Sequence, residues 1–156
     1  LSSSSAASDV YKRQFKYFDK FHNSNKKKVA ALYNFYVDYG SEELKDIRAD
    51  VANIAKRAIK CKIRAYTAYV VDTKIYRSDV CNKLLVDHKC EVAAAYNYDL
   101  LSDLWLISLR SLKGSGIDVS ELAKDINDGG GHENASCVKY TGNLRDLFEI
   151  NFLKKV

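Results

Sequence analysis

The sequence contains no methionine, and its four cysteines form no Cys-x-x-Cys pair. The wide spacing of Cys61, Cys81, Cys90 and Cys137 gives no support to a zinc or redox motif. We expect buried or half-buried thiols in a reducing cytoplasm, although the spacing alone leaves a disulfide open. No apolar run approaches the roughly 20 residues that span a bilayer, and a signal-peptide pattern is absent. The sequence therefore predicts a cytoplasmic protein without a membrane segment.

The bulk composition is that of an ordinary globular protein. The length of 156 residues suffices for one domain, or for one small domain with an appendage. Hydrophobic residues make up 47% and charged residues 29%, which is typical of a soluble fold. The net charge of +5 is dispersed along the chain, so it is compatible with an anionic ligand without requiring one.

The first residues differ from the rest of the chain. The stretch Ser4–Gln14 resembles the translation of a sequencing adapter, and the alternative is a natural disordered tail rich in Ser and Ala. Both interpretations predict that residues 1–14 contribute nothing to the fold. We expect a natural reading frame from about Phe15, with a helical connector over 15–60 and a single domain over 61–156.

The predicted connector contains two helices. Apolar residues at helical spacing follow Lys28, and Gly40 is expected to end this first helix as a C-cap. Ser41 is expected to cap a second helix over 42–60, which carries one continuous apolar stripe.

From residue 61 onward, short strands alternate with short helices. Strands are predicted at 63–71, 90–98, 104–109 and 138–141, and the small apolar residues of the second strand favour a central position. Helices are predicted after Ser78-Asp79, after Asp118 with Glu121 as a capping box, and after Asn143. The fold class is therefore α/β: a small mixed β-sheet with packed helices, preceded by the helical connector.

Two short segments combine features that suit a phosphate. Arg110, beside Ser108 at a predicted strand end, offers a guanidinium that can make a bidentate contact. The run Gly129–Gly131 can bring backbone N–H groups close to an anion. His132 can donate to a phosphate oxygen, and the Asn134 amide can orient the loop.

Each of these residues also has a structural interpretation. Arg110 could pair with a surface carboxylate, and the glycines could form a flexible helix C-cap. His132 could bond the loop backbone, and Asn134 could cap the turn. Cys137 could pair with the His132 imidazole, but a small packed residue is expected instead.

Four segments, taken in order, resemble the DHH-associated substrate-binding domain, which is the C-terminal domain of the DHH phosphoesterase superfamily. The superfamily includes RecJ-like exonucleases, nanoRNases that act as oligoribonucleases, cyclic-dinucleotide phosphodiesterases and exopolyphosphatases. The resemblance covers about residues 62–152 and departs at Asp128, where the family has a fourth glycine, and at Ala135–Cys137. The segments are Arg77–Leu84, Trp105–Ser111, Ile117–Ala123 and Gly129–Ala135.

The resemblance implies that this chain is the substrate-binding part of a metal-dependent phosphoesterase. Its substrate would be a short oligonucleotide or another phosphorylated small molecule. Two divalent metals, usually manganese, would be bound by a catalytic domain that precedes this one, so this chain would hold no catalytic or metal-binding residue. The residues implied in phosphate binding are Ser108, Arg110, Gly129, Gly130, Gly131, His132 and Asn134.

Two features of the sequence leave alternatives open. Asp87-His88 is half of the superfamily's catalytic signature, but Lys89 follows it, and a surface loop is the expected interpretation. The second functional hypothesis is a non-catalytic nucleic-acid-binding module, such as the C-terminal domain of alanyl-tRNA synthetases. A purely structural domain is the third.

Overall fold

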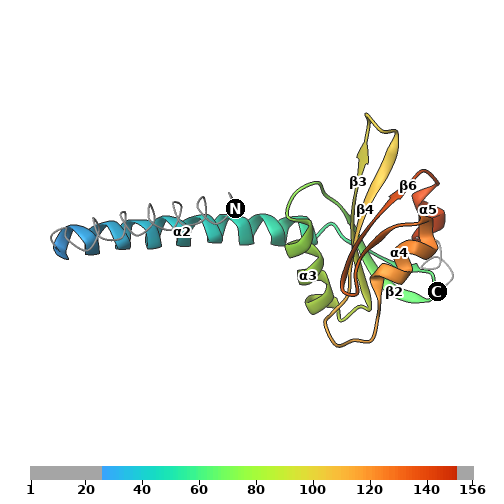
Figure 1. Cartoon of the computed structure of the whole chain (residues 1–156), viewed down its shortest axis with the longest axis horizontal. Coiled ribbons are helices and arrows are strands. Elements are labelled where there is room, and N and C mark those ends of the chain that lie inside the picture. Colours follow the sequence, from blue (N-terminus) through green and yellow to red (C-terminus); the bar gives the residue numbers. More distant parts are fainter. Residues whose placement is uncertain (1–25, 151–156) are drawn as a thin grey trace, which may run out of the picture. The chain divides into compact units, whose positions relative to one another are not determined.

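The computed structural model describes residues 26–150, so the prediction for residues 1–14 and the part of the predicted connector before residue 26 lie outside the described residues. The chain divides into two compact units, one ending at Asp46 and one beginning at Ile47. The described elements are α2 (Lys26–Ala55), β1 (Ile59–Ile63), β2 (Tyr66–Asp72), α3 (Arg77–His88), β3 (Val92–Asp99), β4 (Leu104–Arg110), α4 (Val119–Asn127), β5 (Gly130–His132), β6 (Ala135–Tyr140) and α5 (Leu144–Leu147) (Figure 1).

A single helix replaces the two predicted for the connector. α2 runs through Gly40 and Ser41 without a break, so neither residue caps a helix end. A glycine in a helix costs only about 1 kcal/mol relative to alanine, which is too little to end a helix with good formers on both sides. The helix stops at Ala55, and Ile59, which was predicted to be helical, begins β1.

The second unit contains a mixed, six-stranded sheet with the order β1-β2-β3-β4-β6-β5. Strands β2 and β3 are parallel, whereas every other neighbouring pair is antiparallel. The predicted α/β class is therefore confirmed. The central position predicted for the small apolar strand is confirmed as well, because β3 lies between β2 and β4.

The strand predicted at 63–71 is confirmed over residues 66–71, which belong to β2, but its start is wrong because Ile63 ends β1 and a turn separates the two strands of a hairpin. β1 and β2 are antiparallel, and the chain turns between Ile63 and Tyr66 with Arg64 in the left-handed conformation at φ 55°. The turn contains no Gly, Pro, Asn or Asp, which are the residues that usually mark a turn. The alternation of apolar residues continues across the turn, so the sequence pattern predicted one strand where the structure has a turn.

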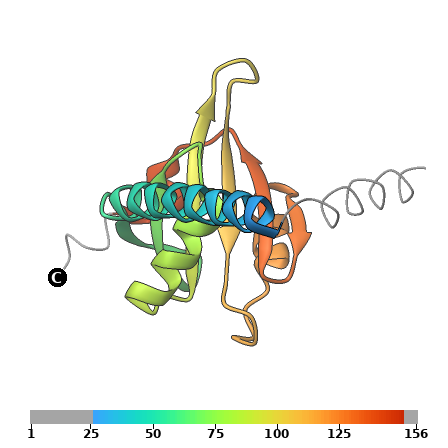
Figure 2. The same ribbon diagram turned by 90° about the vertical axis from the view of Figure 1, so that its left-hand side faces the viewer.

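Helices cover both faces of the sheet (Figure 1). Val92 and Ala94 of β3 belong to a buried cluster with α4 and α5, whereas Ala93 and Ala95 belong to a cluster with α3 and the end of α2. Successive strand residues point to opposite faces, so a strand buried on both sides is apolar throughout. Seen from the α3 side, the β3–β4 hairpin extends beyond the rest of the sheet (Figure 2).

Two of the three side-chain caps predicted at helix starts are formed. The Asp118 side chain accepts from the backbone N–H groups of Ser120 and Glu121, and Asn143 accepts from that of Arg145, as predicted. The capping box is half formed, because the Glu121 carboxylate pairs with Lys124 at 2.7 Å.

The start of α3 differs from the prediction. Ser78-Asp79 was expected to cap it, yet both residues lie inside the first turn of the helix. The N-cap is Tyr76 at φ 50°, and no side chain caps the helix.

Asp87 and His88 form the last turn of α3 rather than a loop, because the helix ends only at Lys89 in the left-handed conformation. The His88 ring stacks on Tyr69 with ring centroids 3.8 Å apart. Within residues 26–150, no helix carries an apolar stretch long enough to cross a membrane.

Replacing Asp118 by Ala is expected to lower the melting temperature most strongly near neutral pH. The pKa of Asp118 lies below its ordinary value, chiefly because the Ser120 side chain donates to the carboxylate. A carboxylate with a lowered folded pKa stabilises the fold above its unfolded pKa, and this contribution disappears as the pH falls through the folded value. Thermal melts of both proteins should therefore converge in acid, and a gap that is constant with pH would contradict this role.

Candidate functional site

The register of the sheet places the predicted cation and the glycine run on one face. Arg110 at the end of β4 lies opposite Ala135 of β6, which lies opposite His132 of β5. Directly paired residues point to the same side of a sheet, so Arg110 and His132 share a face. The adjacent row contains Ser108, Cys137 and Gly130.

We call this surface the site face: the α3 side of β4, β6 and β5, which carries Ser108, Arg110, Gly130, His132 and Cys137. It is the same side as α3, because Ser108 and Arg110 pair with Ala95 and Ala93 of the cluster beneath that helix. The two β4 residues are half-buried, whereas the other three are exposed. The site face is therefore open to solvent along β5 and β6.

Two arginines join the first turn of α3 to β4. Arg110 Nη2 donates to Ser78 Oγ at 2.6 Å, and Arg77 Nη1 donates to Ser108 Oγ at 3.4 Å. Arg77 Nη2 also donates to Asn97 Oδ1 of β3. We call Arg77 and Arg110 the arginine pair.

No carboxylate neutralises the arginine pair within the described residues. The ion pairs found there are Arg64–Asp125, Lys83–Asp87 and Lys124–Glu121, and none involves Arg77 or Arg110. Arg77 Nε is buried without a hydrogen-bond partner. Arg77 as a whole is half-buried, and partial burial of a cation without an acidic partner costs free energy. The uncapped N-terminus of α3 adds partial positive charge at the same place.

Sequence reasoning missed Arg77, Ser78 and Asn97 as parts of the site. Arg77-Ser78 opened one of the segments that carry the family resemblance, but Ser78 was assigned only a helix-capping role and Arg77 none. Asn97 offered a clearer signal: it is a buried amide, 8% exposed, in a strand of small apolar residues. Buried amides need hydrogen-bond partners, so an Asn at such a position indicates a polar contact.

The glycine run is an edge strand and not a free loop. Gly130–His132 forms β5 and pairs with β6. The N–H of Gly129 donates to the Ala123 carbonyl of α4 at 3.0 Å, so this N–H is not free for an anion. The helix cap itself is Asp128 at φ 50°, and the chain passes from it directly into β5.

Close packing against β6 explains two of the three glycines. A Cβ on Gly131 would lie 2.4 Å from the Ala135 carbonyl oxygen, and one on Gly129 would lie 2.7 Å from that of Cys137. Nothing lies within 4 Å of a Cβ on Gly130. The first two glycines are therefore required by the fold, whereas Gly130 leaves open space on the site face.

Asn134 ties the β5–β6 turn to the segment after β4. Its Nδ2 donates to Ser111 Oγ at 3.0 Å and to the Leu112 carbonyl at 3.2 Å. The Ser111 N–H donates back to the Asn134 carbonyl at 3.3 Å. These contacts agree with the orienting role that the sequence suggested for the Asn134 amide.

His132 and Cys137 are both exposed on the site face. The imidazole makes no hydrogen bond within residues 26–150, so the alternative in which His132 bonds the loop backbone is not found there. The expectation that Cys137 packs as a small core residue is wrong, because its side chain lies on the solvent side of β6. The described part of the chain contains no group of three His, Cys, Asp or Glu side chains placed to hold a metal.

The other three cysteines are buried and unbonded, as the sequence predicted. Burial raises the pKa of Cys61 to about 12 and that of Cys81 to about 12. It also raises the pKa of the Cys90 thiol above its ordinary value. These three thiols are therefore protonated and unreactive near neutral pH, which leaves Cys137 as the accessible thiol.

Comparison with known proteins finds similarity in fold alone. No protein-family model and no curated protein matches the sequence. The pGpG-specific phosphodiesterase PggH from Vibrio cholerae aligns over 93% of this chain and 50% of its own, with 13% identity and a TM-score of 0.55. An uncharacterized protein from Helicobacter pylori G27 aligns over 82% of this chain and 35% of its own, with 15% identity and a TM-score of 0.46. The chain thus spans half or less of either protein's length.

The glycine packing predicts a large difference between two neighbouring alanine variants. Gly131→Ala should destabilise the protein by about 1–3 kcal/mol, because the new Cβ would overlap backbone atoms of β6. Gly130→Ala should change stability by no more than about 0.5 kcal/mol, because its site is open. Urea unfolding measures both, and equal losses for the two variants would contradict the packing described above.

Proposed function

We propose that this chain is the substrate-binding part of a metal-dependent phosphoesterase that acts on short oligonucleotides or related phosphodiesters. The arginine pair carries the proposal, because both guanidinium groups lie at the contact between α3 and the sheet and have only neutral oxygens as hydrogen-bond partners. A phosphate of the substrate supplies the missing negative charge, and guanidinium groups bind phosphate through strong, charge-assisted hydrogen bonds.

The residues of the site take different parts in this binding. Arg110 contacts the phosphate directly, since its contact with Ser78 uses one N–H and leaves others for a ligand. His132, which lies in the same row two strands away on β5, donates to another phosphate oxygen. Gly130 allows the substrate to approach the edge of the sheet.

The remaining residues hold these groups in place. Ser108 and Asn97 fix the Arg77 guanidinium, which adds positive charge beneath the phosphate. Asn134 fixes the turn beside His132 through Ser111 and Leu112. Gly129 and Gly131 let β5 lie close against β6.

Two comparisons support the choice of substrate. The fold is similar to that of a protein described as a pGpG-specific phosphodiesterase, which fits a short oligonucleotide. The ordered motifs resemble the substrate-binding domain of the DHH phosphoesterases.

Bond cleavage belongs, in this proposal, to a separate catalytic domain that binds two divalent metals, usually manganese. The described residues contain no group of three potential metal ligands, so we derive no step through a metal from this chain. Its contribution is to hold the phosphodiester in place, which lowers the entropic cost of the reaction.

Replacing Arg110 by Ala should weaken the binding of a 5′-phosphorylated dinucleotide by about 10- to 100-fold. A hydrogen bond between charged groups contributes about 1.5–3 kcal/mol, which corresponds to this range. Isothermal titration calorimetry measures the change. Arg145→Ala, which removes an exposed guanidinium from α5, serves as the matched control and should bind as the wild type. Unchanged affinity in Arg110→Ala would favour a purely structural domain.

The chain alone should bind the dinucleotide without cleaving it, even with manganese added. The reason is that the proposed catalytic metals belong to a different domain. Chromatographic separation of the reaction mixture would detect the mononucleotide product. Turnover that depends on manganese and rises with protein concentration would overturn the assignment of catalysis to a separate domain.

A further inference from the structure

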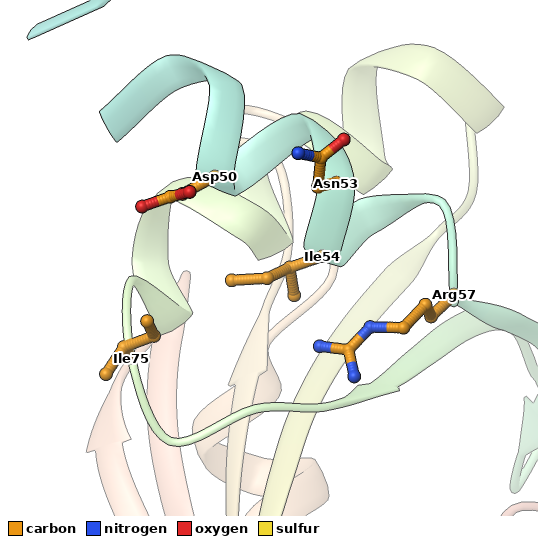
Figure 3. A pocket seen from close by; sticks show the side chains of 5 residues that line it. All are labelled: Asp50, Asn53, Ile54, Arg57 and Ile75. Carbon is orange, nitrogen blue, oxygen red and sulfur yellow. The ribbon is translucent and has the colours of Figure 1, made fainter. Parts of the chain in front are cut away.

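A pocket of about 390 Å³ adjoins the start of α3 (Figure 3). It lies between the end of α2 and the loop that joins β2 to α3. Its volume falls in the range of about 300–1,000 Å³ that is typical of small-molecule sites. Its lining residues are Asp50, Asn53, Ile54, Arg57 and Ile75.

The pocket combines an apolar floor with uncommitted polar groups. Ile54 is buried at 8% exposure and Ile75 is exposed at 56%, so the two present apolar surface. In Figure 3 the Asp50 carboxylate and the Arg57 guanidinium lie on opposite sides of Ile54. Within the described residues, neither the Asp50 carboxylate nor the Arg57 guanidinium is in an ion pair. The two residues do not pair with each other, although they are only seven positions apart in the sequence.

The loop that forms one wall is held in a fixed conformation. Thr73 Oγ1 donates to the Ile75 carbonyl at 2.9 Å and accepts from the Ile75 N–H at 3.3 Å. The Thr73 N–H donates to the Tyr96 carbonyl of β3 at 3.0 Å. Ile75 therefore keeps its place relative to the sheet.

The pocket and the arginine pair are close along the chain. Ile75 precedes Arg77 by two residues, and two residues span at most about 7 Å. In a nucleotide, one sugar separates the phosphate from the base, which is a distance of the same order. The backbone that carries Arg77 is therefore within about 7 Å of the pocket wall at Ile75, and one nucleotide would occupy both places with its phosphate at the arginine pair and its base in the pocket.

We infer that the pocket binds a purine base with the hydrogen-bond pattern of guanine. This inference rests on the proposed phosphate site. Guanine offers two adjacent acceptors, O6 and N7, which match the Arg57 fork, and an amino donor that matches the Asp50 carboxylate. Its flat ring covers Ile54. Adenine places an amino donor where guanine has O6, so it would meet the Arg57 donors with a donor of its own.

Calorimetric titration of the full chain with GMP, AMP and ribose 5-phosphate tests the inference. GMP should bind about 5- to 150-fold more tightly than AMP, because one good bidentate contact discriminates between bases by about 1–3 kcal/mol. Asp50→Asn should reduce GMP affinity by about 10-fold and leave ribose 5-phosphate binding unchanged. Asp46→Asn removes an exposed carboxylate one turn earlier, outside the pocket lining, and should change nothing.

The outcomes separate the pocket from the phosphate site. If ribose 5-phosphate binds and Arg110→Ala weakens it, while GMP and AMP bind equally, the base pocket is wrong and the phosphate site stands. Wild-type affinity for GMP in both Asp50→Asn and Arg57→Gln would likewise overturn the base pocket alone. If none of the three compounds binds the wild type, the proposed phosphate site fails, and the base pocket fails with it.

Discussion

The contacts between the first turn of α3 and β4 determine how the site is built. α3 begins where β2 ends and returns across the sheet to the parallel strand β3, as crossover helices do. The first two residues of α3 contact β4, the strand next to β3: Arg77 donates to Ser108, and Arg110 donates to Ser78. These contacts use neutral oxygens, so they fix two cations without neutralising them. The positive charge left at this position is the physical basis of every functional proposal made above.

The sequence predicted those parts of the fold whose signals are local. Asp118 and Asn143 marked two helix starts, because a short acceptor side chain caps the free N–H groups of a helix. The small apolar run of β3 marked a strand buried on both faces. The helix end predicted at Gly40 was wrong, because a glycine does not end a helix by itself. The turn at Arg64 could not be predicted from the sequence, because nothing in the sequence indicates that this arginine adopts the left-handed conformation.

The sequence predicted some residues of the candidate site but neither Arg77, Ser78 and Asn97 nor the geometry of the site. Motif reasoning found Arg110 and the glycine run, yet nothing local says that β6 lies between β4 and β5. That strand order, with its register, brings Arg110 and His132 to one face. The structure also divides the glycines by cause: Gly131 is required by contact with β6, whereas Gly130 faces open space. A steric role for some glycines is thus compatible with a binding role for the surface they form.

The accessible thiol on the site face offers the most direct test of whether a phosphate binds there. Cys137 lies in the row next to Arg110 and His132, while the other cysteines are buried. A thiol-reactive dye should modify Cys137 alone in the folded protein, and a saturating 5′-phosphorylated dinucleotide should slow that reaction by about 10-fold or more, in proportion to the occupied fraction. A labelling rate that stays the same under conditions where calorimetry shows full binding would mean that the ligand lies elsewhere on the molecule.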